Sequence, residues 1–406
     1  MSSKALRVVF FTDSYLEVDG VANTARQFEA YIRRKKIPFL MLYGGYERER
    51  VSHEGELTRV ELPRSRFGFR LDCRHDFDLA FLRHTSRVMK LISEFKPDVV
   101  HITGPSDVGI LGAVIADRMK IPLVGSWHTN LHQYAERRAL PLLGFLPDKS
   151  RRRAGKVIRE LSFRATARFY HIPRVLMAPN QELVALLEKA AGKPCFLMGR
   201  GVDTELFHPR KRTRSEGSFT VGYVGRITTE KNAGALVEIE RALHAAGITD
   251  CRFLIVGQGS SESYLRSHLK NASFTGVLTG EDLARAYANM DVFAFPSRTD
   301  TFGNVVLEAL ASGVPALVTD EGGPQFIIKN GETGYICATS EAMAERLAVL
   351  KSSRETLVRM SRAARWYAEG TSWDNIFEAV YRAYEEALEP SAGVRVGLET
   401  KLPAGV

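Results

Sequence analysis

Residues Val221–Asn232 read VGYVGRITTEKN and show how the chain is organised. Their β-branched and aromatic side chains predict a strand that ends at Gly225-Arg226, and Lys231 begins the next helical pattern. The same order of a short apolar run, a turn and a helical stretch is repeated on both sides of this segment. Such alternation is typical of α/β domains, in which helices cover both faces of a parallel sheet.

A polar, turn-rich segment divides this alternation into two halves. Gly201-Val202-Asp203, Pro209 and the run from Arg210 to Ser218 favour loop structure and predict a linker. Before the linker we expect strands and helices in the order 7–11, helix 21–36, 38–43, helix 76–95, 98–102, helix 107–119, 122–126, 175–178 and helix 180–190. After it we expect 219–224, helix 231–246, 251–256, helix 261–269, a strand near 273, helix 280–289, 292–295, helix 303–312, 316–319 and a helical C-terminus.

These elements predict an α/β protein with two consecutive, doubly wound parallel-sheet domains. The predicted domains are residues 1–205 and 206–371, followed by a last helix at 372–389 and a disordered tail at 390–406 that is rich in Gly and Pro. Ligands of open α/β sheets bind beyond the carboxyl ends of the strands. We therefore expect a binding cleft between the domains, formed by residues at strand ends.

The composition is that of a globular protein. The 406 residues are 45% hydrophobic and 25% charged, which supports sizeable cores and excludes a fibrous or disordered chain. We find no apolar run of membrane-spanning length, and polar Thr12-Asp13-Ser14 follow the first strand too early for a secretory signal. The four cysteines lie far apart and predict no metal or redox site. We expect a reduced, cytoplasmic protein.

Positive charge is concentrated in the first half. Residues 1–200 carry 34 basic and 21 acidic side chains, a net charge of +13, whereas residues 201–406 carry a net charge of −4. The densest basic run comprises Arg151, Arg152, Arg153, Lys156, Arg159, Arg164 and Arg168, with apolar residues between them. As a helix, this run has a basic amphipathic surface that suits an anionic lipid surface or nucleic acid. A solvated helix face explains one charge run equally well, and the imbalance between the halves favours an anionic partner.

Two motifs of the second half could bind an anionic sugar derivative. Gly303 opens a helix after the polar loop that carries Asp300, and Glu308 interrupts an apolar run on that helix. Burying Glu308 costs free energy unless hydrogen bonds satisfy it, and either vicinal sugar hydroxyls or neighbouring backbone amides would do so. Arg226 and Lys231 form the second motif, because two cations at a strand end and a helix start suit a diphosphate. Solvated surface cations are the alternative for that pair.

The first half offers weaker signals. Gly20 opens a helix after the first strand, but it stands alone and lacks the Gly-x-Gly-x-x-Gly series of nicotinamide enzymes. His128 follows another strand, where it could hydrogen-bond a sugar hydroxyl or be a structural histidine.

The chain resembles glycosyltransferase family 4 in an ordered set of motifs that spans Arg7 to Leu388. The set comprises Gly20, His128, Gly201-Val202-Asp203, Gly225-Arg226, Lys231, Gly257-x-Gly259, Asp300-Thr301-Phe302-Gly303, Glu308-Ala309 and Ala311-x-Gly313-x-Pro315. The resemblance implies a GT-B fold, in which two Rossmann-like domains face across a cleft and the last helix crosses back to the first domain. It also implies retaining transfer from a nucleotide-sugar co-substrate, without a cofactor or an essential metal.

The resemblance also implies roles for individual residues. Arg226 and Lys231 would hold the donor diphosphate, and Glu308 would accept hydrogen bonds from the ribose hydroxyls. Asp300 stands where the family usually has Glu and would contact the donor hexose, and His128 would bind the transferred sugar near the reacting carbon. These roles make His128, Arg226, Lys231 and Asp300 the predicted catalytic residues. Further implied donor contacts are Gly20, Val277, Phe302, Gly303, Asn304 and Val305.

Three segments resemble one branch of this family most closely. They are Val18–Val21, Trp127–Asn130 and Arg200–Pro209, where Arg200 replaces the Asn that is usual in the family. The branch contains GDP-mannose-dependent alpha-mannosyltransferases and sulfoquinovosyl-diacylglycerol synthases. It implies transfer of a hexose, from GDP-mannose or a UDP-hexose, to a lipid or lipid-linked hydroxyl by a cytoplasmic protein at the inner face of the membrane.

Two other functions compete with this hypothesis. The same fold could act on a soluble sugar or small metabolite. A non-catalytic nucleic-acid binder would use the basic run, but it leaves Asp300 and Glu308 unexplained, and the run has no aromatic stacking series. We therefore expect no nucleic-acid partner.

Overall fold

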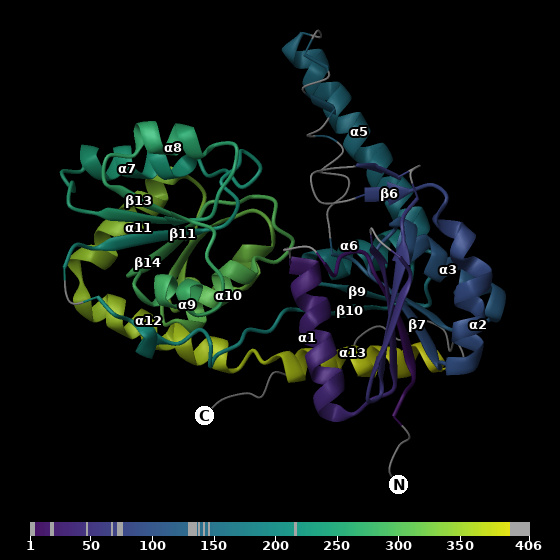
Figure 1. The fold of residues 1–406 in the computed structure, drawn as a ribbon. Helices are drawn as coiled ribbons and strands as arrows, with labels where there is room; N and C mark the ends of the chain where they lie inside the picture. Colours follow the sequence, from purple (N-terminus) through teal and green to yellow (C-terminus); the bar gives the residue numbers. More distant parts are fainter. Residues whose placement is uncertain are drawn as a thin grey trace.

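The computed structural model describes residues 5–16, 20–45, 48–65, 68–70, 76–128, 136, 139–140, 143–144, 147–214 and 217–389. The segments Val18-Asp19 and Thr129-Asn130, Cys73 and the tail 390–406 lie outside these residues, so the structure does not address the predictions made for them. Two lobes, each built on its own sheet, lie side by side (Figure 1).

The first lobe contains an eight-stranded sheet in the order β10-β9-β8-β7-β1-β2-β4-β3. Its strands are β1 Val8–Thr12, β2 Phe39–Gly45, β3 Arg50–Glu54, β4 Leu57–Pro63, β7 Val99–Ile102, β8 Leu123–Ser126, β9 Val175–Ala178 and β10 Cys195–Leu197. Strand β3 pairs antiparallel with β4, and the other described pairs of this sheet are parallel. A separate hairpin joins β5 Gly68–Arg70 to β6 Asp76–Asp78. The helices are α1 Gly20–Lys35, α2 Thr85–Phe95, α3 Asp107–Met119, α5 Asp148–Phe169 and α6 Gln181–Ala191, with a 3₁₀ turn at Phe81–His84.

The second lobe contains a six-stranded parallel sheet in the order β13-β12-β11-β14-β15-β16. Its strands are β11 Thr220–Val224, β12 Arg252–Val256, β13 Ala272–Gly276, β14 Val292–Phe295, β15 Ala316–Thr319 and β16 Gly334–Cys337. Its helices are α7 Ala235–Ala245, α8 Glu262–His268, α9 Gly280–Ala288, α10 Asn304–Ala311, α11 Ser340–Ser352 and α12 Arg354–Glu369, with 3₁₀ turns at Pro209–Lys211 and Gly323–Phe326. The predicted fold of two parallel-sheet α/β domains is confirmed.

Strand β1 shows why the central strands are apolar along their whole length. All five of its residues are buried. Val8 and Phe10 pack into a cluster with α1, whereas Val9 and Phe11 pack into another on the opposite face with α2 and α3. Alternate side chains therefore enter different cores, and both faces of the strand need apolar residues.

Helix α13, Trp373–Leu388, lies along the first lobe although it follows the helices of the second (Figure 1). Phe377 stacks on Phe28 of α1 with ring centroids 4.4 Å apart and an interplanar angle of 8°. Arg34 of α1 forms an ion pair with Asp374. The chain thus passes between the lobes twice, once through the linker after β10 and once before α13.

Two predicted helix starts are wrong. The helix expected from Lys231 begins at Ala235, because Asn232 has a φ of 52° and residues 229–234 form turns. The helix expected over residues 76–95 begins at Thr85. The Asp78 carboxylate accepts hydrogen bonds from the backbone amides of Ser65 and Ala80 and from Arg83, which holds this segment in a turn.

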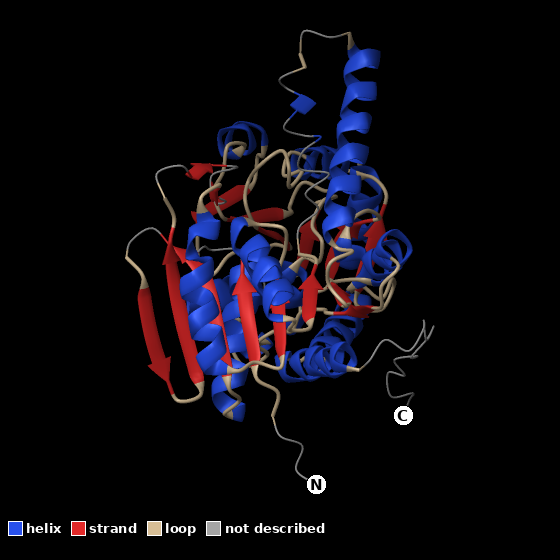
Figure 2. Cartoon of the chain, turned by 90° about the vertical axis from the view of Figure 1, so that its right-hand side faces the viewer, coloured by secondary structure: helices blue, strands red, loops and turns tan. Residues whose placement is uncertain are grey.

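Helix α5 extends well beyond the body of the first lobe, on the side opposite α13 (Figures 1 and 2). The helical reading of the basic run is thereby confirmed. None of the described helices combines the length and the apolar character needed to cross a lipid bilayer.

Candidate active site

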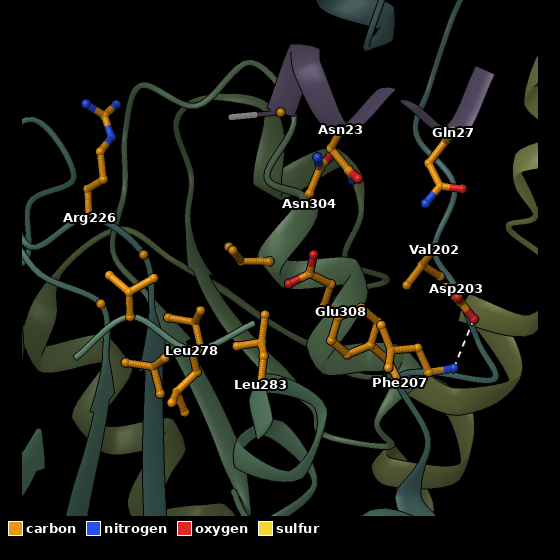
Figure 3. A pocket seen from close by; sticks show the side chains of 18 of the residues that line it. Asn23, Gln27, Val202, Asp203, Phe207, Arg226, Leu278, Leu283, Asn304 and Glu308 are labelled. Carbon is orange, nitrogen blue, oxygen red and sulfur yellow. Dashed lines mark hydrogen bonds between the residues drawn. The ribbon is translucent and has the colours of Figure 1, made fainter. Parts of the chain in front are cut away.

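A cavity of about 540 Å³ lies between the lobes, a volume suited to a small organic ligand (Figure 3). Asn23 and Gln27 of α1 line it from the first lobe, and Arg226, Lys231 and Glu308 line it from the second. Val202, Asp203, Leu206 and Phe207 of the linker, together with Gly201 and Trp373, complete the wall where the chain passes between the lobes. Three of the four charged residues that the sequence singled out in the second lobe therefore share one cavity, and the fourth, Asp300, is not among the lining residues.

Arg226 reaches the cavity from the loop that follows β11. Gly225 precedes it with a φ of 152°, and a Cβ at Gly257 would lie 2.0 Å from the Gly225 carbonyl oxygen. A Cβ at Gly259 would lie 2.3 Å from the carbonyl oxygen of Ile227. The two loops thus pack backbone against backbone, so the Gly-x-Gly turn is required for this close approach whether or not a ligand is bound. Arg226 also forms a 3.3 Å ion pair with Glu230.

Lys231 forms an ion pair with Asp300, with 2.5 Å between Nζ and Oδ1. Both side chains are largely buried, at 14% and 19% exposure. Burial alone would raise the pKa of Asp300, but the adjacent Lys231 ammonium outweighs it and leaves that pKa below its ordinary value. Asp300 is therefore ionised at neutral pH and orients the Lys231 ammonium at the edge of the cavity.

Glu308 projects into the cavity from α10 (Figure 3). Burial raises the pKa of its carboxyl to about 7, although the Tyr287 hydroxyl, which donates to Oε2 at 2.8 Å, partly opposes the shift. The partner of this carboxylate in the described structure is thus a hydroxyl, and the alternative that it caps backbone amides is not what the structure shows. A carboxyl group whose pKa is about 7 can ionise at neutral pH and accept hydrogen bonds from a ligand in the cavity.

The start of α10 also contributes to the cavity. Gly303 has a φ of 100° and precedes the helix, so Asn304 and Val305 in its first turn line the wall. A Cβ at Gly20, which also lines the cavity, would lie 3.4 Å from the Asn304 side chain, so this glycine lets the two lobes approach closely. Phe302, Gly303 and Asp300 lie next to the lining residues rather than among them, whereas the predicted contact Val277 is one of the lining residues.

His128 lies outside the cavity lining and is buried. Its Nε2 is 2.7 Å from the Ser126 hydroxyl, and its Nδ1 is 2.6 Å from Nη2 of Arg200. The His128 carbonyl accepts a 3.0 Å hydrogen bond from the Thr301 hydroxyl of the second lobe. In this arrangement both ring nitrogens are engaged within the protein, so the predicted hydrogen bond from the ring to a sugar would require one of them to be released.

Sequence reasoning predicted Gly20 of α1 but missed Asn23 and Gln27 of the same helix, and it missed much of the apolar wall. Asn23 and Gln27 are four residues apart and therefore share one face of the helix that Gly20 begins, a spacing that is readable in the sequence. The apolar residues Leu278 and Leu283 gave no signal of their own. Within the described residues, no three His, Cys, Asp or Glu side chains gather as a metal site would require.

Two family models together match most of the chain. The model described as Glycosyltransferase Family 4 matches residues 18–206, and the model described as Glycosyl transferases group 1 matches residues 205–366. The boundary between them coincides with the linker between the two lobes.

Curated relatives align over nearly the full length. A GDP-mannose-dependent alpha-mannosyltransferase of Mycobacterium tuberculosis is 30% identical over 398 residues, which cover 94% of this chain and 96% of the relative. Sulfoquinovosyl transferase SQD2 of Arabidopsis thaliana is 30% identical over 397 residues, covering 91% of this chain and 72% of the relative.

Solved structures share the architecture. Sucrose-phosphate synthase of Thermosynechococcus elongatus has a TM-score of 0.72 at 16% identity, covering 94% of this chain and 98% of that one. Anabaena HepE in complex with UDP and glucose has a TM-score of 0.63 at 14% identity, covering 94% and 99%. These similarities confirm the GT-B fold, and with the near-full-length relatives they show that the chain is a glycosyltransferase that belongs to glycosyltransferase family 4.

Proposed function

We propose that this enzyme transfers a hexose, with retention of anomeric configuration, from GDP-mannose or a UDP-hexose to a hydroxyl of a lipid or lipid-linked acceptor. The observation that carries the proposal is that Arg226, Lys231 and Glu308 line one cavity between the lobes. The names of the M. tuberculosis and A. thaliana relatives, a mannosyltransferase and a sulfoquinovosyl transferase, support a sugar donor of this kind.

The wall of the cavity suits the parts of a nucleotide sugar in turn. Val224, Val256, Val277, Leu278 and Leu283 provide an apolar region for the base, and Glu308 provides acceptors for the ribose hydroxyls. Arg226 and Lys231 provide the positive charge for the diphosphate. With the nucleotide bound in this order, the hexose would lie toward Asp300 and the contact in which the Thr301 hydroxyl donates to the His128 carbonyl.

During transfer, the bond between the anomeric carbon and the diphosphate oxygen breaks, the acceptor oxygen bonds to the same face of the sugar, and the acceptor's hydroxyl proton passes to the departing diphosphate. Negative charge develops on the departing diphosphate as its bond breaks. Arg226 and Lys231 are already in place at the cavity, so they stabilise this charge without reorganisation. We propose that these two cations supply the positive charge that a divalent metal supplies in other transferases.

A nucleotide screen tests the donor proposal. We expect GDP or UDP, and then its hexose conjugate, to raise the melting temperature of the full chain, because a ligand that binds only the folded state stabilises it. Anomeric proton couplings of the product would report retention, and turnover in excess EDTA should equal turnover without it. No stabilisation by any nucleotide sugar, an inverted product or full loss in EDTA would each contradict the corresponding part of the proposal.

The acceptor proposal rests on helix α5. Val157 and Leu161, four residues apart, are 50% and 60% exposed on this projecting helix. Exposed basic side chains surround them, namely Arg153, Lys156, Arg159, Arg164 and Arg168. Apolar residues flanked by cations suit the surface of an anionic bilayer, where the cations meet head groups and the apolar side chains enter the interface.

We therefore expect the double variant V157S/L161S to bind anionic vesicles at least about tenfold more weakly than the wild type. Each apolar side chain that leaves the interface loses about 1.5–3 kcal/mol of burial. Co-sedimentation with vesicles of phosphatidylglycerol and phosphatidylcholine measures this. The variant V349S/V358S, which changes two exposed valines of the second lobe, is the matched control and should bind like the wild type. Absence of wild-type binding at every salt concentration would instead favour a soluble acceptor.

A further inference from the structure

A chain of polar side chains runs through the interior of the first lobe and ends beside the cavity. Arg200 contacts Nδ1 of His128, and Nε2 of His128 contacts the Ser126 hydroxyl. The same hydroxyl is 2.8 Å from Nε2 of His101, and Nδ1 of His101 is 2.7 Å from the Tyr384 hydroxyl on α13. All five residues are buried. The chain therefore connects the linker, two strand ends and the last helix.

The direction of these hydrogen bonds follows from Arg200. A guanidinium has only donors, so Nδ1 of His128 must be the unprotonated nitrogen and Nε2 carries the proton. His128 then donates to Ser126, and each contact is satisfied if Ser126 donates to His101 and His101 donates to Tyr384. Arg200 thus selects one neutral tautomer of His128.

Arg200 is also fixed by the backbone around it. Its Nη1 donates to the carbonyl oxygens of Met198 and Gly199, at 3.0 Å each. A buried guanidinium held in this way is a rigid donor, because moving it would leave two carbonyls and a histidine nitrogen unpaired. The position of the His128 ring follows from the position of the linker that carries Arg200.

The backbone of His128 connects this series of hydrogen bonds to the second lobe. Its carbonyl accepts from Thr301, and the Thr301 carbonyl in turn accepts from the Asn180 side chain at 2.8 Å. Thr301 follows Asp300, the partner of Lys231. The contact between the lobes at this point therefore lies beside the region where the proposed donor hexose would react.

We propose that Arg200 is a positioning residue, which holds the His128 ring as the tautomer with an unprotonated Nδ1 and so fixes the contact between His128 and Thr301 beside the donor hexose. Arg200 lies outside the cavity lining and acts through His128. The effect on turnover rests on the proposed transferase function, whereas the effect on the tautomer does not.

The role of Arg200 can be measured through the pKa of His128. Burial, and then the Arg200 and His101 neighbours, hold the pKa of His128 well below its ordinary value. Other titratable or charged groups on the elements around it are Tyr170 at the end of α5, Tyr384 on α13 and Asp300 beside Thr301. Removing the Arg200 cation removes one of the causes that lower the pKa, so the ring should become protonated at a higher pH.

The test compares Arg200→Met and Arg200→Gln in the full chain labelled with ¹⁵N-histidine. The ring nitrogen shifts of wild-type His128 should report an unprotonated Nδ1, and the ring should remain neutral at pH values where an ordinary imidazole is protonated. In R200M the pKa of His128 should rise toward its ordinary value, because the Arg200 charge no longer lowers it. R200Q keeps an N–H donor without the charge, so it should retain the tautomer and show a smaller rise.

Turnover is measured with whichever of GDP-mannose and UDP-glucose the wild type consumes. We expect R200M to lower kcat about tenfold while KM for the donor changes less than about threefold, because the diphosphate contacts are intact. R200Q should recover part of kcat. R200M should also gain an acidic limb in its pH profile that the added H128N substitution removes.

Arg365→Met is the matched control. Arg365 is another largely buried arginine, and its Nη1 donates to the carbonyls of Thr204, Phe207 and Ala311. R365M should lower the melting temperature without moving the His128 titration or the pH profile. Unchanged His128 signals and kcat in R200M, or equal changes in R365M, would overturn the inference. A wild type that consumes neither sugar nucleotide would overturn the proposed function and leave the tautomer result to stand on its own.

Discussion

The double variant R226A/K231A should turn over its donor at least about a thousandfold more slowly than the wild type. Loss of one preorganised donor to a developing anion lowers kcat by about 10²–10³, and loss of two cations that act on the same diphosphate costs more than either alone. Both side chains line the cavity from the same loop, which connects β11 to α7. The affinity for a nucleoside monophosphate should fall much less than the affinity for the diphosphate, because the base and ribose contacts remain.

Folding has to be separated from catalysis in this experiment, since Lys231 is the partner of the largely buried Asp300. Removing the lysine alone leaves a carboxylate without its cation, which is destabilising. K231A/D300N avoids this penalty, so its melting temperature should lie above that of K231A while its turnover remains low. R285A/K351A removes the same two charges from ion pairs on the surface of the same lobe and should keep wild-type turnover. Wild-type rates in R226A/K231A would exclude the proposed mechanism.

The elements that the sequence predicts best are those buried on both faces. Strands β9, β14 and β15 have the predicted bounds. Uninterrupted apolar runs such as Val292–Phe295 are typical of strands that are buried on both faces of a parallel sheet. Strand β3, Arg50–Glu54, is exposed at every residue and carries no apolar pattern, so only its pairing with β4 makes it a strand. The sequence also predicts neither edge strand β10 nor edge strand β16, although both contain apolar residues and are partly buried. The sequence therefore predicts most of the central strands, although β4 is missed, and among the edge strands of the two large sheets it predicts β13.

The candidate site also contains residues that the sequence predicts and residues that it does not. Arg226 and Glu308 could be predicted because one follows a strand end and the other interrupts an apolar helix face, and Lys231 could be predicted as a second cation on the loop that carries Arg226. On the opposite wall Gly20 was predicted, whereas Asn23 and Gln27 were missed, because the local sequence of α1 does not show that this face of the helix meets the other lobe. The pairing of His128 with Arg200 joins residues 72 positions apart and likewise has no local signal.

The Glu308→Gln variant should bind nucleoside diphosphate about tenfold or more weakly at pH 8, where a carboxylate accepting two hydroxyl hydrogen bonds is worth more than an amide. In the free protein the pKa of Glu308 is about 7, so the group is mostly protonated at pH 6 and mostly ionised at pH 8. Ribose hydroxyls donate to the ionised form and favour it. Wild-type affinity should therefore rise about tenfold from pH 6 to pH 8, with release of a proton on binding, and E308Q should lose both effects.

The raised pKa of Glu308 also makes the stability of the free protein depend on pH. Ligand affinity should rise with pH, whereas the free energy of unfolding should fall. Because the folded protein holds this proton more tightly than the unfolded chain, whose carboxyl has its ordinary value of 4.5, Glu308 lowers the free energy of unfolding as the pH rises from 4.5 to 7. E308Q should remove that dependence of the free energy of unfolding on pH.

For the binding prediction, calorimetric titrations in two buffers of different ionisation enthalpy count the proton that is released when the nucleotide binds. E240Q is the matched control, since Glu240 is a buried acid of the same lobe that accepts from the backbone amides of Lys270 and Asn271. Binding that is independent of pH in the wild type, or equally altered in E240Q, would show that Glu308 does not receive the ribose.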